Sequence, residues 1–276
     1  MPPRPTSLAF RAALALCAAA SASHAQEDLP LTPPPPTVWE GAIGLTGSYR
    51  PEYAGAAKQL FKVSPALFLR YGRFTITNAS GFVTRRDDDV VQGLGLDMVR
   101  NESLRLNVAL RLDGGRSENT SEALTGLGEI KPTVRARLQA SVKLQGPWRA
   151  GASLSLDALH RGGGNFGDIS GGWERAIAPR TLLGLGSSMS FGAQRYMQSY
   201  FGITPEQASR TRYAVFKPGA GVRDVTAYGN LRHDIGSEWT VLSGASATRL
   251  LGQAAESPLT GRKTSWGISA GFARRF

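Results

Sequence analysis

Apolar and polar residues alternate at every second position through much of the chain. The pattern is clearest in residues 104–113, where leucine and valine alternate with arginine, asparagine, alanine and aspartate. It continues in 134–145 and 148–159, with apolar residues or alanine set against mostly polar or small ones. A helix cannot gather such residues on one stripe, because its period is about 3.6 rather than 2. These segments are therefore predicted strands with one apolar and one polar face.

Weaker alternation elsewhere brings the prediction to about twelve strands from Val38 onward. The further segments are 38–49, 59–71, 74–84, 91–100, 165–177, 181–192, 219–232, 239–251 and 264–276. The connections alternate between short ones, such as 72–73 and 146–147, and longer ones, such as 114–133 and 193–218. This sorting is typical of a transmembrane antiparallel up-and-down β-barrel with short periplasmic turns and longer extracellular loops. The fold class is all-β, with the barrel over 38–276, and a final strand that ends in Phe276 is typical of bacterial outer-membrane barrels.

The N-terminus predicts export of a Gram-negative outer-membrane protein. Residues 1–25 form a signal peptide, with Arg4 and Arg11 before a short apolar run and a small-x-small cleavage site before Gln26. The proline-rich residues 26–37 are interpreted as a periplasmic tail, either an inert spacer or a docking peptide. Cys17 is the one cysteine and would leave with the signal, so thiol chemistry is excluded from the mature chain.

The charge of the chain limits the kinds of molecule that it is expected to bind. The formal charge is +11, and it falls to +9 once Arg4 and Arg11 are removed. Basic residues are spread along the chain without a dense run, which argues against nucleic acid. We expect outer-membrane lipid and the phosphates of lipopolysaccharide as counterparts.

No arrangement of residues predicts an enzyme, a metal site or a cofactor site. His160 is expected at a loop entrance and His233 at a periplasmic turn, about 25 Å apart at opposite rims. The residues Asp87, Asp88 and Asp89 lack the alternate spacing of a calcium loop and follow two arginines. We therefore expect no catalytic, cofactor-binding or metal-binding residues.

Basic residues on the polar face of three consecutive strands form a candidate lumen constriction: Arg105, Arg111, Arg135, Arg137, Lys143 and Arg149. One interpretation is an interior salt-bridge network that stiffens the barrel, with carboxylates such as Asp113, Asp157, Asp224 and Glu40. The other is an anion-selective constriction, since rings of arginine and lysine favour anions.

Three blocks resemble the MipA/OmpV family of outer-membrane proteins. They are Pro51-Glu52-Tyr53-Ala54-Gly55, the stretch from Arg195 to Ser209 followed by Gly219 to Val225, and Arg249-Leu250-Leu251-Gly252 through Pro258. The resemblance implies an outer-membrane barrel, and one family member joins a membrane-bound lytic transglycosylase to a bifunctional murein synthase. The family has no established catalytic residues, so none are carried over.

The sequence therefore predicts a non-enzymatic outer-membrane barrel with a structural or scaffolding role in the cell envelope, linking a murein hydrolase and synthase. The alternative is a narrow, anion-preferring pore or small-solute channel with a basic lumen. In the long loop 193–218, Tyr196, Tyr200 and Phe201 form either a plug that folds inward or a platform for a ligand outside.

Overall fold

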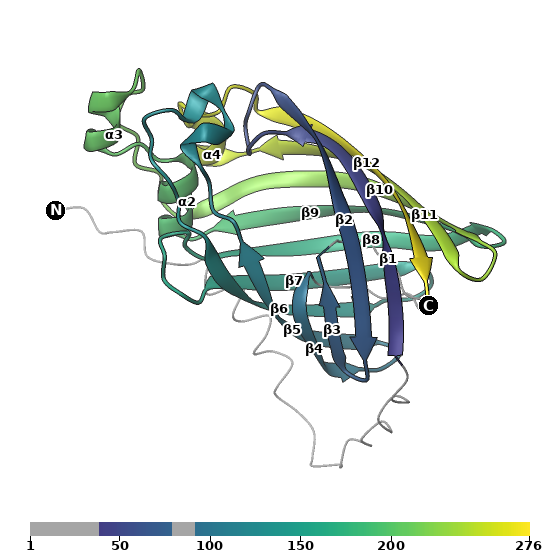
Figure 1. Cartoon of the computed structure of the whole chain (residues 1–276). Helices are drawn as coiled ribbons and strands as arrows, with labels where there is room; N and C mark the ends of the chain where they lie inside the picture. The colour runs from purple at the N-terminus through teal and green to yellow at the C-terminus, as the bar shows by residue number, and fades with distance from the viewer. Residues whose placement is uncertain (1–38, 79–91) are drawn as a thin grey trace, which may run out of the picture. The chain divides into compact units, whose positions relative to one another are not determined.

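The computed structural model describes residues 39–78 and 92–276, which hold twelve strands in one closed antiparallel barrel (Figure 1). Each strand pairs with its neighbours in sequence, and the first closes on the last. The predicted class, strand number and up-and-down order are confirmed. The strands are β1 (Trp39–Pro51), β2 (Gln59–Tyr71), β3 (Phe74–Thr77), β4 (Gly93–Arg100), β5 (Leu104–Asp113), β6 (Thr133–Lys143), β7 (Trp148–Asp157), β8 (Phe166–Ala178), β9 (Thr181–Gly192), β10 (Gly221–Ile235), β11 (Trp239–Leu250) and β12 (Thr264–Arg275).

The seam between β1 and β12 is continuous. Its register runs from Ala42 opposite Arg275 to Tyr49 opposite Ile268. Beyond Arg275, the Gly41 N–H donates to the Phe276 carbonyl at 3.1 Å, and the Phe276 N–H donates to the Gly41 carbonyl at 2.9 Å. An unpaired backbone group in hydrocarbon costs several kcal/mol, so this closure is what allows the sheet to sit in a bilayer.

The outward face of the barrel is apolar. Its exposed side chains include Ile43, Leu110, Ile169 and Ile268, each flanked in sequence by inward residues that are small or polar. Exposed aromatics gather near the ends of the strands where the short turns lie: Trp39, Tyr71, Trp148, Trp239 and Phe276. Such a girdle is typical of a membrane interface, where one part of the ring contacts lipid and the other contacts water.

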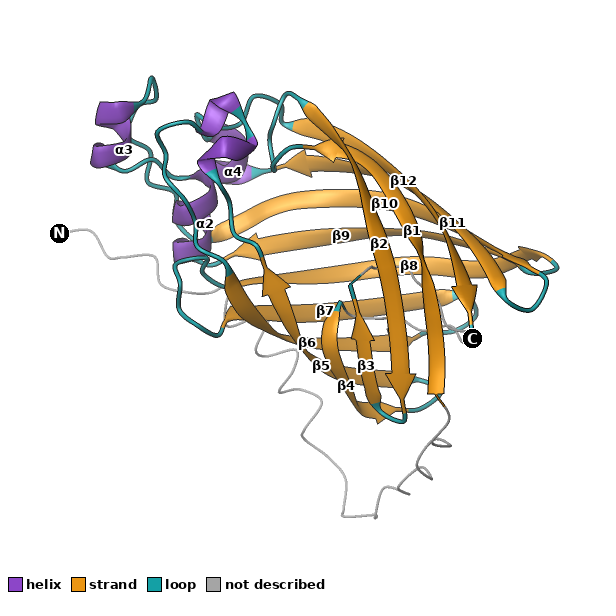
Figure 2. Ribbon diagram, viewed as in Figure 1, coloured by secondary structure: helices purple, strands orange, loops and turns teal. Residues whose placement is uncertain are grey.

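The two ends of the barrel differ in their connections. Residues 72–73, 101–103, 144–147, 179–180 and 236–238 are the short connections, and we call this the turn end. The other end, which we call the loop end, carries the longer connections and the helices (Figure 2). The helices are α2 (Gln194–Phe201), α3 (Pro205–Arg210), α4 (Gly252–Glu256) and the 3-10 turns η2 (Glu118–Thr120) and η3 (Glu122–Leu124). In the part of the chain that is described, no helix is long and apolar enough to cross a membrane.

Tight turns explain part of the glycine content. Gly72, Gly146 and Gly236 lie in short turns with φ of +57°, +66° and +64°. Glycine adopts this left-handed region without the steric penalty that a side chain brings. The sharp reversals at the turn end depend on these residues.

Several predicted strand boundaries differ from the observed ones by one to three residues, and one of these differences changes the position of a predicted turn residue. His233 lies within β10 rather than in a turn, because β10 and β11 stay paired as far as Ile235 opposite Trp239. The His233 Nδ1 lies 2.9 Å from the Thr181 hydroxyl on β9. The predictions for 1–38, for the end of segment 74–84 and for Asp87 to Asp89 lie outside the described residues.

Candidate functional site

The six basic residues predicted for the lumen share the inward face of β5, β6 and β7. Arg111 stands opposite Arg135 in the β5–β6 ladder, and Lys143 stands opposite Arg149 in the β6–β7 ladder. Arg105 stands opposite Ser141, and Arg137 stands opposite Ser155. The apolar partners of the same strands, such as Leu110 and Leu138, are exposed on the outside. The register therefore places these cations together on one wall of the barrel interior.

Arg135 is the most deeply buried of the six, with 3% of its surface exposed. Its Nε forms an ion pair with Asp113, and its Nη1 donates to the Gly164 carbonyl at 2.7 Å. Its guanidinium carbon lies 5.0 Å from the centre of the Phe166 ring. Burial of a charge is tolerated when it is paired and hydrogen-bonded, and Arg135 meets both conditions.

Two further ion pairs line the same wall. Arg137 lies 3.3 Å from Asp168, whose other oxygen accepts a hydrogen bond from Ser153 at 2.7 Å. Arg149 lies 3.2 Å from Glu174. Three of the six predicted cations therefore contact a carboxylate on another strand. Asp113 and Glu174 lie on strands adjacent to their arginines, whereas Asp168 on β8 is reached by Arg137 across β7.

Arg111 and Lys143 differ from these three. Within residues 39–78 and 92–276, neither forms an ion pair with a carboxylate, and both are exposed. They stand on opposite halves of the wall, Arg111 toward the loop end and Lys143 at the turn end. Their charge is therefore offset less directly than that of Arg135.

Helix α2 covers the loop end of the charged wall. Tyr196, Met197 and Phe201 are buried, so its apolar stripe faces inward. The Tyr196 ring stacks on Tyr200 at a centroid distance of 4.6 Å and lies 5.1 Å from Phe166 on β8. Of the two alternatives for these aromatics, burial agrees better with the plug, although their role stays a prediction.

Arginine side chains hold this aromatic cluster in place. Arg223 donates to the Tyr196 hydroxyl at 2.7 Å, and its guanidinium carbon lies 5.6 Å from the centre of the Phe166 ring. Arg116 donates to the Tyr200 carbonyl at 3.0 Å. Burial raises the pKa of Tyr200 to about 12, and the nearby Asp113 carboxylate adds to the shift. The phenol is therefore neutral at ordinary pH.

A second apolar cluster binds the loops to one another. Leu124, Leu127, Ile203 and Leu259 are buried together, although they come from three different loops. Tyr53 packs against them and donates to the Leu259 carbonyl at 3.1 Å. The loop end is thus a packed cap rather than a set of separate loops.

The inward face also carries an apolar cluster that the alternation did not predict. Ala42, Ala66, Phe68 and Ala273 are buried against one another, with Leu242 packed beside them. They come from β1, β2, β11 and β12 on the side of the barrel away from the cations. The sequence signal was the run of small residues at every second position in these strands.

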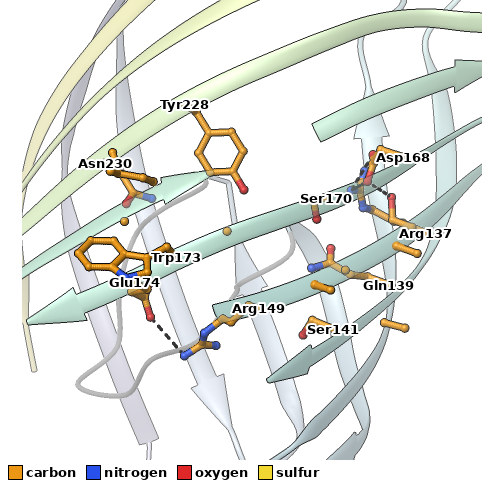
Figure 3. Close-up of a pocket in the computed structure, with 18 residues that line it drawn as sticks. Arg137, Gln139, Ser141, Arg149, Asp168, Ser170, Trp173, Glu174, Tyr228 and Asn230 are labelled. Atoms are coloured by element: carbon orange, nitrogen blue, oxygen red, sulfur yellow. Dashed lines mark hydrogen bonds and ion pairs between the residues drawn. The ribbon is translucent and has the colours of Figure 1, made fainter. Parts of the chain in front are cut away.

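A cavity of about 170 Å³ lies against the inner wall formed by β6 to β10. Figure 3 shows its polar lining, with Arg137 and Asp168 at one side and Arg149 and Glu174 at another. Tyr228 and Asn230 of β10 complete it, and neither was singled out from the sequence. Both fall on polar positions of the alternating segment 219–232, and this alternation is the feature of the sequence that could have placed them in the lumen.

The histidines do not form a catalytic pair. His160 follows β7 at the loop end, whereas His233 lies near the turn end of β10. In the described ranges, no three histidine, cysteine, aspartate or glutamate side chains are close enough to hold a metal ion.

Several solved outer-membrane proteins resemble this fold. An anion-selective porin from Comamonas acidovorans is 9% identical over 87% of this chain and 99% of its own, with a TM-score of 0.38. OmpT of Vibrio cholerae is 8% identical over 87% and 97%, and the toluene transporter TodX of Pseudomonas putida is 9% identical over 87% and 90%, both also at 0.38. No curated protein sequence matches the chain. A family model described as "MltA-interacting protein MipA" matches residues 43–276.

Proposed function

The chain belongs to the MltA-interacting protein MipA family, and we propose that it is a non-enzymatic structural barrel that binds a lytic transglycosylase at its turn end. A bifunctional murein synthase would be the second partner of the same scaffold. The apolar outer face would contact outer-membrane lipid, with lipopolysaccharide around the loop end. The proposal includes removal of residues 1–25 as a signal and a periplasmic tail over 26–37.

The observation that carries the proposal is the interior ion pairing. Arg135, Arg137 and Arg149 each contact a carboxylate, and α2 packs over the loop end of the same wall. Such pairs restrict the side chains and offset the charge of three of the six cations that an open anion pore would present. A stiff barrel suits a scaffold, because a partner then meets a rim that does not rearrange.

The turn end sets the kind of partner that fits. A stable interface buries about 800 Å² on each side, which no single short turn provides. A partner would therefore have to contact several turns at once. Arg73, Arg175 and Arg180 are exposed there, so an acidic surface on the partner would be complementary.

Pull-down from a detergent extract tests the scaffold. With the barrel as bait, a lytic transglycosylase or a murein synthase should be enriched over an unrelated barrel. Arg180→Glu at the turn end should weaken capture, whereas the matched change Arg212→Glu at the loop end should leave it unchanged. Absence of enrichment for both prey proteins would remove the scaffolding role.

A second candidate function, a narrow anion-preferring pore, is favoured by Arg111 and Lys143. These two cations have no carboxylate partner in the described part of the lumen, so their charge would act on passing ions. Purified protein in a planar bilayer should then conduct, and Arg111→Glu with Lys143→Glu should lower the preference for anions. A bilayer that stays electrically silent would end this candidate.

A further inference from the structure

We propose that the lumen cavity between β6 and β10 binds a small neutral solute rich in hydroxyl groups, of the size of one sugar ring. This inference concerns the interior wall and does not depend on the scaffolding role. It is drawn from the charge balance of the lining, the hydrogen-bonding groups left over, and the glycines that shape the cavity (Figure 3).

The charges of the lining cancel in pairs. Arg137 is matched by Asp168 at 3.3 Å, and Arg149 is matched by Glu174 at 3.2 Å. An anion that approached either arginine would also meet its carboxylate, and a cation would meet the arginine. A charged solute therefore gains little here, while it loses hydration.

Neutral polar groups line the rest of the cavity: Gln139, Ser141 and Ser170 beside the ion pairs, and Asn230 beyond Glu174. In the described residues, none of these four side chains forms a hydrogen bond with another protein group. Their amides and hydroxyls offer both donors and acceptors to a ligand. Hydroxyl groups suit such a lining, because each can donate and accept at once.

Glycines on β9 give the cavity its form. Tyr228 stands opposite Gly186 in the β9–β10 ladder, and a Cβ added at Gly186 would lie 2.6 Å from the Tyr228 ring. Asn230 stands opposite Gly184 in the same way, and a Cβ there would lie 3.1 Å from its Cγ. The tyrosine and the asparagine therefore lie along the wall, which leaves open space above them. A flat ring face is also a suitable surface for the C–H groups of a sugar.

The volume limits the ligand. About 170 Å³ is below the roughly 300–1,000 Å³ of pockets for drug-sized molecules, and it corresponds to about five or six waters. Arg149 and Glu174 lie close to the turn end of their strands, so the cavity extends from the middle of the barrel toward that end. A solute on the periplasmic side would therefore reach it without passing the α2 cover.

Calorimetric titration of the folded protein in detergent tests the proposal with three matched sugars. Glucose is neutral, glucuronate carries a carboxylate and glucosamine carries an ammonium group. Glucose should bind with the lowest Kd of the three. Asn230→Ala and Gln139→Ala should each raise its Kd roughly three- to tenfold, as expected for the loss of one neutral hydrogen bond.

Ser269→Ala is the control, because Ser269 stands on β12, which contributes no residue to the cavity. It should leave the Kd for glucose unchanged, and circular dichroism should show β structure in all three variants. No heat of binding for glucose, equal Kd values for the charged sugars, or unchanged Kd in both cavity variants would overturn the proposal. Capture of periplasmic partners would be unaffected by any of these results.

Discussion

Two opposite walls of the barrel share the same alternation of inward and outward residues, but they carry different residues at the inward positions. On β5 to β7, the inward positions hold long charged side chains such as Arg111, Arg135 and Arg149. On β11, β12 and β1, the inward positions near mid-strand hold residues such as Gly44, Gly271 and Ala273. Both walls present apolar residues to the outside.

The difference shows that contact with lipid determines which residues occur on the outer face of a barrel, whereas the space available in the lumen determines which occur on the inner face. Long side chains from one wall need space, and the small residues opposite provide it. The charged wall is stabilised by ion pairs between strands. The small-residue wall is instead stabilised by close backbone approach and by the buried cluster around Phe68.

The largest effect is expected from Arg135→Ala on the charged wall. This change removes the buried arginine with its hydrogen bond to the Gly164 carbonyl, and it leaves the partly buried Asp113 without its partner. Loss of one partner of a fully buried pair costs about 3–5 kcal/mol, so we expect a loss near the lower end of that range. Urea unfolding in detergent, followed by tryptophan fluorescence, measures the free energy of unfolding. Lys143→Ala is the matched control and should change it by less than about 0.5 kcal/mol. Equal losses in the two variants would mean that ion pairing does not stabilise this wall.

A smaller effect is expected from Gly44→Ala on the opposite wall. A Cβ there would lie 2.7 Å from the Ala273 Cα and closer still to the Phe272 carbonyl oxygen. The seam between β1 and β12 would have to shift, and overpacking of this kind costs about 1–3 kcal/mol. Gly171→Ala has nothing within 4 Å of the added atom and should be nearly neutral. Heat-modifiable migration on gels and the unfolding midpoint measure both, and a neutral Gly44→Ala would show that the small wall is loosely packed.

The smallest effect concerns pH at the loop end, where Tyr200 lies beside the charged wall. Its pKa is raised to about 12 in the folded protein, against about 10 in the unfolded chain. Between these values the unfolded chain loses the proton first, so stability is unchanged below pH 10 and falls as pH rises toward 12. Tyr200→Phe should reduce this loss, while Tyr71→Phe at the turn end should not. Unfolding midpoints from pH 9 to pH 12 give the comparison, and identical profiles would contradict it.

Most of the barrel could be predicted from the sequence, because alternation reports both faces of a strand at once. Residues 104–113 were predicted with the bounds that β5 has. The end of β10 could not be placed, since pairing with β11 extends the strand through His233 to Ile235. The local alternation of apolar and polar residues does not show how far pairing with a neighbouring strand extends a strand.

The sequence predicted which basic residues face the lumen, but it predicted only some of the carboxylates that pair with them. Asp113 was among the expected carboxylates and pairs with Arg135. Asp168 and Glu174 were not among the expected carboxylates. Their ion pairs with Arg137 and Arg149 depend on the register between strands and on the length of the side chains, which the sequence pattern does not give. Helix α2 was also missed, since its eight residues lie in a segment whose helicity is stabilised by packing on Phe166 and Arg223.

The seam between β1 and β12 has a consequence for how the chain assembles. Every other ladder joins consecutive strands and forms early from local contacts, whereas this one joins residues more than two hundred positions apart, as in Tyr49 and Ile268. Contacts of such sequence separation form slowly, and until then the ribbon has two exposed edges that other chains could pair with. Delivery of an unfinished ribbon to the bilayer is therefore the stage at which this protein is most vulnerable to aggregation.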